Sequence, residues 1–588
     1  MTSCRSDQQP GGVSRRGFLT AAAGAAALAG LGWTPAQAIP FGDARATLPT
    51  PPAFPDGIAL VQQGYENWAR EIRFDQVWTC TPRDAQDVVR LANWAHANGY
   101  RLRPRGTMHG WSPLTLEAGQ NVDRVLLVDT MARLNAVAVD ASGAAEGRAT
   151  VTAGAGATVE AILTELQAHG LGWANAPTIG VLTIAGVLAI DAHGATLPAD
   201  GESALPGASF GSLSNLVTAM TAVVWDEAAG RYELREFSRA DAAIRPLLTH
   251  LGRSFVTSVT LQAGPNYRLR CESVTDIPWR ELFAPAGSPG RTFESYVARS
   301  GRVEAIWFPF TETPWLKVWT PTPVKPPQSR EVTGPYNYWY SDNLPQAVTD
   351  PLGLITRGIG SATPLFGQAQ FATIASGLAT TGTADLWGWS KDVLFYLRAT
   401  TLRMNAGGGV VITRRSNIAR VINEFTGWHH RRQQELRAAG RYPINGPFEV
   451  RLCGLDDQGE VTVESAGAPT ISALRPRPDH PEWDTAIWMN VVGVPGTPGQ
   501  AAYFREMELF MRENYSGDYA TFRPEWAKGW AFTDRAGHSD GPSIDSVIPD
   551  IYRDGVPSGD NWDTACAAYN ANDPHRIFSN GFLDRLLP

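Results

Sequence analysis

Apolar residues recur every three or four positions in the stretch TPRDAQDVVRLANWAHANG, residues 81–99, and this spacing predicts a helix. Its apolar face is formed by Val88, Leu91, Ala92 and Ala95. The flanking residues fit the helix ends, with Thr81 at the N-cap, Pro82 in the first turn and Gly99 at the end.

A second helix is predicted over residues 416–440, SNIARVINEFTGWHHRRQQELRAAG, with Ser416 as its cap. Ile418, Val421, Ile422 and Phe425 share one face of it. His429 and His430 are adjacent and therefore point to different sides, and neither has a metal-ligand partner four residues on. We expect both histidines to be solvated.

Strands are predicted where polar and apolar residues alternate or where short apolar runs occur. They are YRLRPR (100–105), RVLLVDT (124–130) and SFVTSVTLQA (254–263). ATVTAGAGATVEAILTELQAHG (149–170) predicts a strand, a glycine-rich turn and a helix, and the apolar stretch 172–215 predicts close-packed loops and short helices. The N-terminal third is therefore α+β or α/β, and a domain boundary is predicted near residue 264.

The alternation in FEVRL, residues 448–452, has a chemical consequence. It places Glu449 and Arg451 on one face of a strand and the three apolar residues on the other. A solvated sheet face would explain the two charges, and a functional pair of opposite charges is the alternative.

The composition indicates a globular chain with a large core. Its 588 residues are 43% hydrophobic and 18% charged, which suits two or more domains. The 20 Trp and 42 Pro suit an aromatic-lined cleft with fixed loops. A net charge of −8 argues against a nucleic-acid partner.

Residues 1–38 have the features of a twin-arginine export signal. Arg15 and Arg16 in SRRGFL precede an apolar run from Leu19 to Trp33, and AQA at 36–38 fits a cleavage site. The run is shorter than the roughly 18 residues that a membrane span needs. Removal of three positive charges and one negative charge with this segment moves the net charge from −8 to −10. We expect a secreted, periplasmic or cell-surface protein that is exported after it folds and binds its cofactor.

Four cysteines lie beyond that signal, Cys80, Cys271, Cys453 and Cys566. They are far apart and form no C-x-x-C pair, so neither a zinc site nor a disulfide framework is indicated, and no metal site is expected. An oxidising compartment still permits a bridge between them.

Two short motifs match known patterns poorly. GAGATV, residues 154–159, follows a strand and opens a helix, but it lacks the third glycine and the later acidic residue of a dinucleotide fingerprint. GASFG, residues 207–211, matches G-x-S-x-G, but a proline and a polar loop precede Ser209 where a nucleophile elbow needs a strand.

His109 is a stronger candidate. It lies between two glycines in RPRGTMHGW, residues 103–111, directly after a predicted strand. Glycines permit close approach of the backbone to a ligand, and a neutral imidazole is a nucleophile or a ligand. Together with VTAGAGATVEAI, GVLTIAGVLAIDAHG and GSLSNLV, this loop forms a series of glycine-rich turns whose N–H groups suit a pyrophosphate. A satisfied structural histidine is the alternative.

This series resembles the FAD domain of the vanillyl-alcohol-oxidase (PCMH-type) superfamily. From about residue 55 to the C-terminus, phrases such as PWRELFAP, EAIWFPFTETPW, WGWSKDV and FRPEWAKGWAF resemble the covalent-flavin (type II) bacterial cholesterol oxidases. The resemblance implies an α+β, two-domain flavoprotein, with an FAD domain of two α/β subdomains and a substrate domain built on a large antiparallel sheet flanked by helices. The implied ranges are 39–264 for the FAD domain, 265–544 for the sterol domain and 545–588 for a segment returning to the FAD domain.

In that family, a histidine of the first glycine-bearing loop is bonded to the flavin 8α-methyl group, which implies FAD attached to His109. The implied cofactor contacts are Arg105, Gly106, Thr107, Met108, Gly110, Leu182, Thr183, Ile184, Gly186, Ala192, His193 and Gly194. Asp191 stands where an asparagine is typical of the family. No cysteine lies between Cys80 and Cys271, so a second covalent bond from this region is not expected.

The resemblance implies oxidation of a 3β-hydroxysterol by O2 to hydrogen peroxide and the 4-en-3-one. Moving a proton from C4 to C6 suits a carboxylate with a raised pKa, and Glu304 in the apolar phrase EAIWFPF is the candidate. The resemblance places Glu449 and Arg451 beside the flavin and implies a charge pair that gates a tunnel, through which oxygen would pass. Asn490 and Lys528 match polar active-site positions.

Two other functions remain open. One is a superfamily oxidase or dehydrogenase of sugars or alditols, whose pocket would need many hydrogen-bonding groups. The other is a non-catalytic, sterol-binding flavoprotein. We expect a monomer that contacts a membrane surface transiently to extract its sterol.

Overall fold

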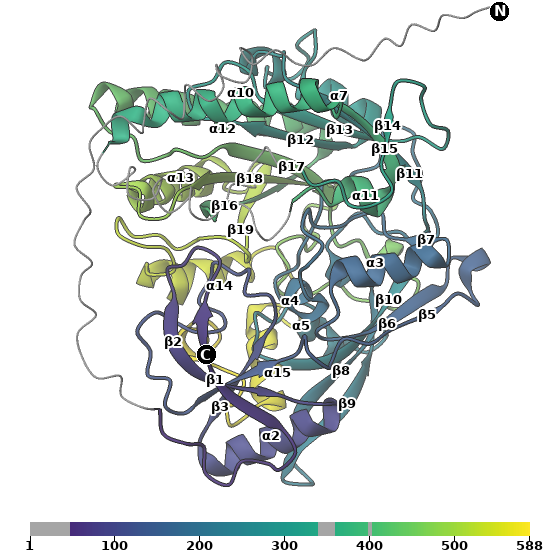
Figure 1. Ribbon diagram of the computed structural model, residues 1–588, viewed down its shortest axis with the longest axis vertical. Helices are drawn as coiled ribbons and strands as arrows, with labels where there is room; N and C mark the ends of the chain where they lie inside the picture. The colour runs from purple at the N-terminus through teal and green to yellow at the C-terminus, as the bar shows by residue number, and fades with distance from the viewer. Residues whose placement is uncertain (1–47, 339–358, 398–402) are drawn as a thin grey trace, which may run out of the picture.

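The computed structural model describes residues 48–338, 359–397 and 403–588, and the strands in these ranges form three sheets (Figure 1). The predicted export signal lies outside the described residues. The two smaller sheets lie in the lower half of Figure 1 and the large sheet lies above them. This arrangement confirms the predicted α+β architecture.

The first sheet contains four strands in the order β1-β2-β4-β3. Their bounds are Ala59–Glu66 for β1, Arg73–Thr81 for β2, Arg101–Arg105 for β3 and Val125–Asp129 for β4. Helix α2 (Ala85–Asn98) joins β2 to β3 and ends at Gly99, as predicted. The predicted cap at Thr81 is wrong, because Thr81 still belongs to β2, and the Asp84 side chain accepts from the backbone N–H of Asp87 instead.

The second sheet has the order β5-β6-β10-β8-β9, and the short strand β7 also pairs with β10. The bounds are Val137–Asp140 for β5, Ala149–Gly154 for β6, Leu171–Gly172 for β7, Val217–Asp226 for β8, Arg231–Ser238 for β9 and Phe255–Pro265 for β10. Three helices accompany it, α3 (Val159–Ala168), α4 (Ile184–Ala189) and α5 (Arg245–Leu248). The stretch 172–215 contains α4, a 3-10 turn at Leu213–Leu216 and compact loops, as predicted.

The glycines of GAGATV serve packing in this second unit. A Cβ atom on Gly156 would lie 2.0 Å from the carbonyl oxygen of Thr130. The backbone at this turn therefore packs against another segment of the chain, which explains the glycine without a Rossmann-type fingerprint. Ser209 of GASFG donates to the Glu460 carboxylate, so this serine is bonded to an acid rather than to a histidine base.

The third sheet has nine strands in the order β14-β15-β11-β13-β12-β17-β18-β16-β19. The bounds are Arg268–Val274 for β11, Arg302–Trp307 for β12, Trp315–Pro321 for β13, Arg330–Glu331 for β14, Asp385–Trp389 for β15, Asn405–Thr413 for β16, Phe448–Gly454 for β17, Thr485–Gly493 for β18 and Ala520–Pro524 for β19. All neighbouring strands are antiparallel except β14 and β15. The helices of this unit are α6 (Trp279–Leu282), α7 (Phe293–Ser300), α10 (Thr363–Thr381), α11 (Ser390–Leu394), α12 (Ile418–Ala438) and α13 (Gln500–Asn514).

Helix α12 packs its apolar face on the sheet, where Ile418, Ile422 and Phe425 join Phe448 and Val450 in one hydrophobic cluster. The helix begins at Ile418 after a short 3-10 turn, Arg415–Asn417, so the predicted cap at Ser416 is wrong.

The predicted solvation of His429 is also wrong. This residue is 2% exposed, and its ring nitrogens lie 2.6 Å from Tyr503 Oη and 2.6 Å from Gln433 Nε2. His429 continues the buried row of Phe425 one turn further on, so it faces the sheet. His430 is partly exposed and stacks on Trp307.

The last part of the chain contains α14 (Ile548–Ile551), α15 (Trp562–Asn572) and α16 (Gly581–Leu586). Helix α15 contacts β8 of the second sheet, and α14 contacts β19 of the third. The backbone N–H of Leu102 in β3 donates to the carbonyl of Ile577. Arg253, just before β10, forms a buried ion pair with Asp573 at 2.9 Å. The domain ranges 39–264, 265–544 and 545–588 remain predictions.

The four cysteines beyond the signal are buried and unpaired in the structure. No helix in the described part of the chain is long and apolar enough to cross a membrane.

Candidate active site

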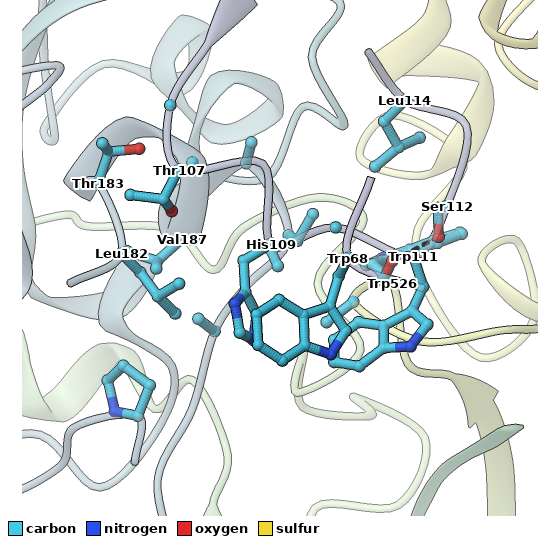
Figure 2. Close-up of a pocket in the computed structure, with 18 of the residues that line it drawn as sticks. Trp68, Thr107, His109, Trp111, Ser112, Leu114, Leu182, Thr183, Val187 and Trp526 are labelled. Atoms are coloured by element: carbon cyan, nitrogen blue, oxygen red, sulfur yellow. Dashed lines mark hydrogen bonds between the residues drawn. The ribbon is translucent and has the colours of Figure 1, made fainter. Parts of the chain in front are cut away.

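A cavity of about 350 Å³ is lined by residues from all three sheets and their loops. One wall is the loop after β3, a second is α4 with the loop that follows it, and a third consists of β17 and the segment after β19. Figure 2 shows the first wall, with the rings of His109, Trp68 and Trp111 close together and Leu182, Thr183 and Val187 opposite them.

The loop Gly106–Gly110 provides backbone donors to this cavity. The N–H groups of Thr107, Met108, His109 and Gly110 have no hydrogen-bonding partner within residues 48–338, 359–397 and 403–588. Met108 adopts a left-handed conformation with φ of 56°, which turns the loop sharply. A Cβ atom on Gly106 would lie 2.4 Å from the Thr183 hydroxyl, so only glycine permits this approach of the loop to α4. Arg105 Nη1 is also buried, and it has no partner in the described part of the chain.

His109 lies against two tryptophans. Its ring centroid is 3.8 Å from Trp68 and 5.6 Å from Trp111, with the second contact edge-on. Burial lowers the pKa of His109 to about 3, and the positive charges of Lys528 and Arg403 act in the same direction. The imidazole is therefore neutral at physiological pH, which is the form that acts as a nucleophile.

The second wall includes Leu182, Thr183, Gly186, Ala192, His193 and Gly194. Ile184 does not line the cavity, because its side chain is fully buried in the hydrophobic core beneath α4. Asp191 also points into the protein, where its carboxylate accepts from Ser472 Oγ and the backbone N–H of Ala473. Burial raises the pKa of Asp191 well above its ordinary value.

The third wall depends on strand register. Glu304 in β12 is the partner of Arg451 in β17, and Glu449 in β17 is the partner of Asn490 in β18. Nε of Arg451 donates to Oε1 of Glu304 at 2.5 Å, and its Nη2 donates to Oε2 of Glu449 at 2.9 Å. The structure thus brings together four residues that the sequence predicted to act at the site.

These four residues differ in their access to the cavity. Glu449 and Arg451 line it, whereas Glu304 and Asn490 lie behind them and are fully buried. The Tyr396 hydroxyl donates to Oε2 of Glu304, so both oxygens of this carboxylate are engaged. The apolar environment predicted for Glu304 from its sequence neighbours is wrong, since a guanidinium and a phenol face it. Both side-chain amide atoms of Asn490 lack a partner among the described residues.

Lys528, in the segment after β19, also lines the cavity, and its Nζ lies 4.3 Å from the centre of the Trp111 ring. The carbonyl of Lys528 accepts from Ser112 Oγ, and so does the carbonyl of Trp526. These bonds tie the segment after β19 to the segment after the His109 loop.

Glu525 is a cavity residue that the sequence analysis missed. It follows the last residue of β19, it is 4% exposed, and its Oε2 has no partner among the residues described. Burial alone would raise the pKa of Glu525, but His193 at 3.7 Å and the charge of Lys528 outweigh burial and lower it. Its position between a strand end and Lys528 in PEWAKGW was the available sequence signal.

Comparison with known protein families identifies the class of protein to which this chain belongs. A family model described as an FAD binding domain matches residues 78–204, which contain the His109 loop and α4. The unpaired N–H groups of that loop, with Arg105 beside them, suit the anionic pyrophosphate of FAD. The chain is therefore a flavoprotein with an FAD-binding domain and a substrate domain.

A second family model, described as cholesterol oxidase, substrate-binding, matches residues 268–588, and the chain belongs to the cholesterol oxidase family. Cholesterol oxidase from Brevibacterium sterolicum is 60% identical, with a TM-score of 0.90 over 92% of this chain and 100% of that one. A histidine-to-alanine mutant of that enzyme is 59% identical with the same TM-score and coverage. A solvent-stable cholesterol oxidase is 52% identical, again with a TM-score of 0.90 and the same coverage.

A long-chain alcohol oxidase from an uncultured marine euryarchaeote is 25% identical over 192 residues. That match spans 32% of this chain and about a third, 34%, of the relative's length.

Proposed function

We propose that this protein is an FAD-dependent cholesterol oxidase that converts a 3β-hydroxysterol to the 4-en-3-one with O2 as electron acceptor and hydrogen peroxide as product. The observation that carries this proposal is the cavity itself. It extends from the unpaired N–H groups at His109 to the ionised pair Glu449–Arg451, and apolar side chains such as Ile179, Leu397 and Val492 also line it.

We further propose a covalent bond between His109 and the flavin 8α-methyl group. The neutral imidazole lies in the loop whose N–H groups are free for the cofactor, and it has no hydrogen bond to another described residue. The sequence contains no cysteine between Cys80 and Cys271, so a second bond from this region is absent from the proposal.

When bound, FAD supplies the acceptor for the hydride that leaves the carbinol carbon. The protein must then take the hydroxyl proton and exclude water. We assign the proton to Oε2 of Glu525, the unpartnered oxygen of an ionised carboxylate in the cavity wall. Lys528 and Arg451 stabilise negative charge that develops on the substrate oxygen.

Isomerisation of the 5-en-3-one needs a carboxylate that can reach the steroid ring. Glu304 does not line the cavity, whereas Glu449 and Glu525 do. We therefore assign this proton transfer to Glu449, a carboxylate that lines the cavity, instead of to Glu304. Glu304 acts through Arg451, which it holds in place.

Anaerobic mixing with a panel of sterols and polyols tests the function. Bleaching of the flavin by cholesterol supports the proposal, and peroxide formation on admission of air supports an oxidase rather than a dehydrogenase. Reduction by an alditol and not by sterols would establish the sugar or alditol enzyme. A flavin that no substrate reduces would establish a non-catalytic, sterol-binding flavoprotein.

The remaining partners are also proposed. The protein is proposed to be a monomer that is exported by the twin-arginine route and is secreted, periplasmic or at the cell surface. There it would contact a membrane surface transiently to extract sterol. The Arg15–Arg16 pair with the following apolar run supports export, and the net charge of −8 argues against nucleic acid.

A further inference from the structure

Lys317 in β13 is a buried cation that the proposed mechanism does not use. Its exposure is 0%, and its Nζ has no hydrogen-bonding partner among the described residues. Burying an ammonium group without compensation is costly, so its surroundings must supply another form of stabilisation.

Four aromatic rings surround Nζ of Lys317. The ring centres of Tyr338 and Tyr396 are each 4.1 Å away, Trp315 is 4.7 Å away and Trp319 is 5.2 Å away. Aromatic faces within about 6 Å attract a cation through the ring quadrupole, more strongly when the group is desolvated. Burial lowers the pKa of Lys317, and the aromatic cage together with the charge of Glu304 opposes this effect by favouring the charged form.

Strand register places Lys317 beside the charged residues of the active site, Glu304, Arg451 and Glu449. Glu304 is the register partner of Lys317 on β13 and of Arg451 on β17, and β12 lies between these two strands (Figure 1). Opposite residues on neighbouring strands have Cβ atoms about 4.5–5.5 Å apart. A row of alternating charge, positive, negative and positive, thus crosses the buried face of the sheet.

Tyr396 connects the cage to the same carboxylate. Its ring faces Lys317, and its hydroxyl donates to Oε2 of Glu304. The ion-paired group at the cavity contains two carboxylates, Glu304 and Glu449, but only one positive charge, that of Arg451. Lys317 supplies the second and makes the buried group neutral overall.

We propose that Lys317 is a positioning residue for the reaction, an ammonium group held by four aromatic rings that lies beside Glu304 in the sheet and thereby helps to hold Arg451 at the end of the cavity. This inference rests on the proposed function, because it assigns Lys317 a part in the same active site. Lys317 does not line the cavity, so it acts through Glu304 and Tyr396 rather than on the substrate.

Other groups contribute to the charge of Glu304. The ionisable residues near it and near its direct partner are Arg451 and Glu449 from β17, Lys317 from β13, Cys271 from β11, Tyr338, Tyr396 after α11, and Glu525 after β19. The effect of Lys317 must therefore be separated from theirs by combining changes at Lys317 and Glu304.

The test uses the flavin-loaded enzyme and the variant Lys317→Met, with Lys325→Met at an exposed site as matched control. Rates of flavin reduction by cholesterol and of reoxidation by O2 are measured from pH 5 to 9. Loss of a nearby opposite charge raises the pKa of a carboxylate. The acidic limb of the rate–pH profile should therefore move to higher pH by at least about one unit in Lys317→Met. It should stay in place in Lys325→Met and return toward its original position in Lys317→Met combined with Glu304→Gln.

An unchanged pH profile in a folded Lys317→Met enzyme overturns the proposal, because a purely structural lysine would affect stability alone. If Lys317→Met fails to fold, recovery of folded, yellow protein in the combined variant supports the charge row, and failure of both variants overturns it. Reoxidation after reduction by dithionite requires no sterol. A pH shift in that step therefore tests Lys317 even if cholesterol fails to reduce the wild-type flavin and the proposed function falls.

Discussion

Arg451 and Glu304 form a buried ion pair with an Nε to Oε1 distance of 2.5 Å, although 147 residues separate them in the sequence. The same guanidinium donates to Glu449 at the cavity wall. A shift of Arg451 therefore changes the surroundings of a carboxylate behind the cavity and of another that lines it.

Glu449→Gln, Arg451→Ala and the double variant test whether the pair gates oxygen. Breaking one side of a buried pair typically costs about 3–5 kcal/mol, because the other charge loses its partner. The double variant should then be less harmful than the sum of the singles, with a coupling of roughly 0.5–3 kcal/mol. Stopped-flow reoxidation by O2 should change more than reduction by sterol.

Two outcomes contradict the oxygen gate. Strictly additive effects would mean that the two residues act independently. Changes confined to flavin reduction would show that the pair positions the substrate instead of controlling access of oxygen.

Replacement of His109 by alanine should remove the covalent flavin. Wild-type protein precipitated with acid should keep a yellow, fluorescent band on a denaturing gel, and His109→Ala should lose it. His169→Ala is a suitable control, because this histidine lies at the exposed end of α3. If acid extracts the flavin freely from the wild-type protein, the flavin is not covalently bound and the proposed linkage is wrong.

Three glutamine variants locate the isomerisation base. Glu449→Gln should accumulate 5-en-3-one relative to 4-en-3-one, since Glu449 lines the cavity. Glu525→Gln should mainly slow the oxidation step, by on the order of 10²–10⁴-fold if it is the general base. Glu304→Gln should affect both steps through Arg451. Chromatographic analysis of both ketones checks these expectations, and a change of product ratio in Glu304→Gln alone would restore Glu304 as the base.

The stability of the enzyme should fall in mild acid because of buried neutral histidines. Burial lowers the pKa of His429 to about 3, below the unfolded value near 6.5. The unfolded chain therefore binds the extra proton first, and the free energy of unfolding should decrease from pH 6.5 toward 3, by up to about 1.4 kcal/mol per pH unit for this residue. Above pH 6.5 it contributes no slope.

Denaturant unfolding at several pH values between 4 and 8 measures this effect. His429→Gln should reduce the slope below pH 6.5, whereas the exposed His169→Ala should leave it as it is. Equal slopes in all three proteins would show that His429 does not carry the dependence.

The spacing of apolar residues predicted much of the fold, because helices and strands each bury residues at a characteristic period. The alternation of FEVRL correctly placed Glu449 and Arg451 on one face. The helix starts were less accurate, since Asp84 competes with Thr81 as a cap and the better position depends on where β2 ends. His429 lies seven residues after Ile422, which is the helical spacing of one face, so its burial had a signal in the sequence.

The site could be predicted only in part. Glycine spacing and family resemblance indicated the His109 loop, because a turn that carries free N–H groups has a local signature. The pairing of Glu304 with Arg451 had none, since it depends on which strands become neighbours and on their register. Tyr396 was missed for the same reason, because it acquires its chemistry from a residue distant in the chain. Glu525 had a local signal in PEWAKGW, but its contact with His193 could not be predicted from that phrase.

The bond between Leu102 and Ile577 has a consequence for the order of events during synthesis. The strand that carries Leu102 leads into the His109 loop, and Arg103 beside it donates to the carbonyl of Phe578. Phe578 is made 475 residues after Arg103, so the nascent chain cannot complete the support of its cofactor loop until this distant segment has been made. Flavin capture then depends on a segment that is made long after the His109 loop. Nascent chains stalled before residue 577 should retain no flavin, whereas the released protein should bind it within the time of final folding.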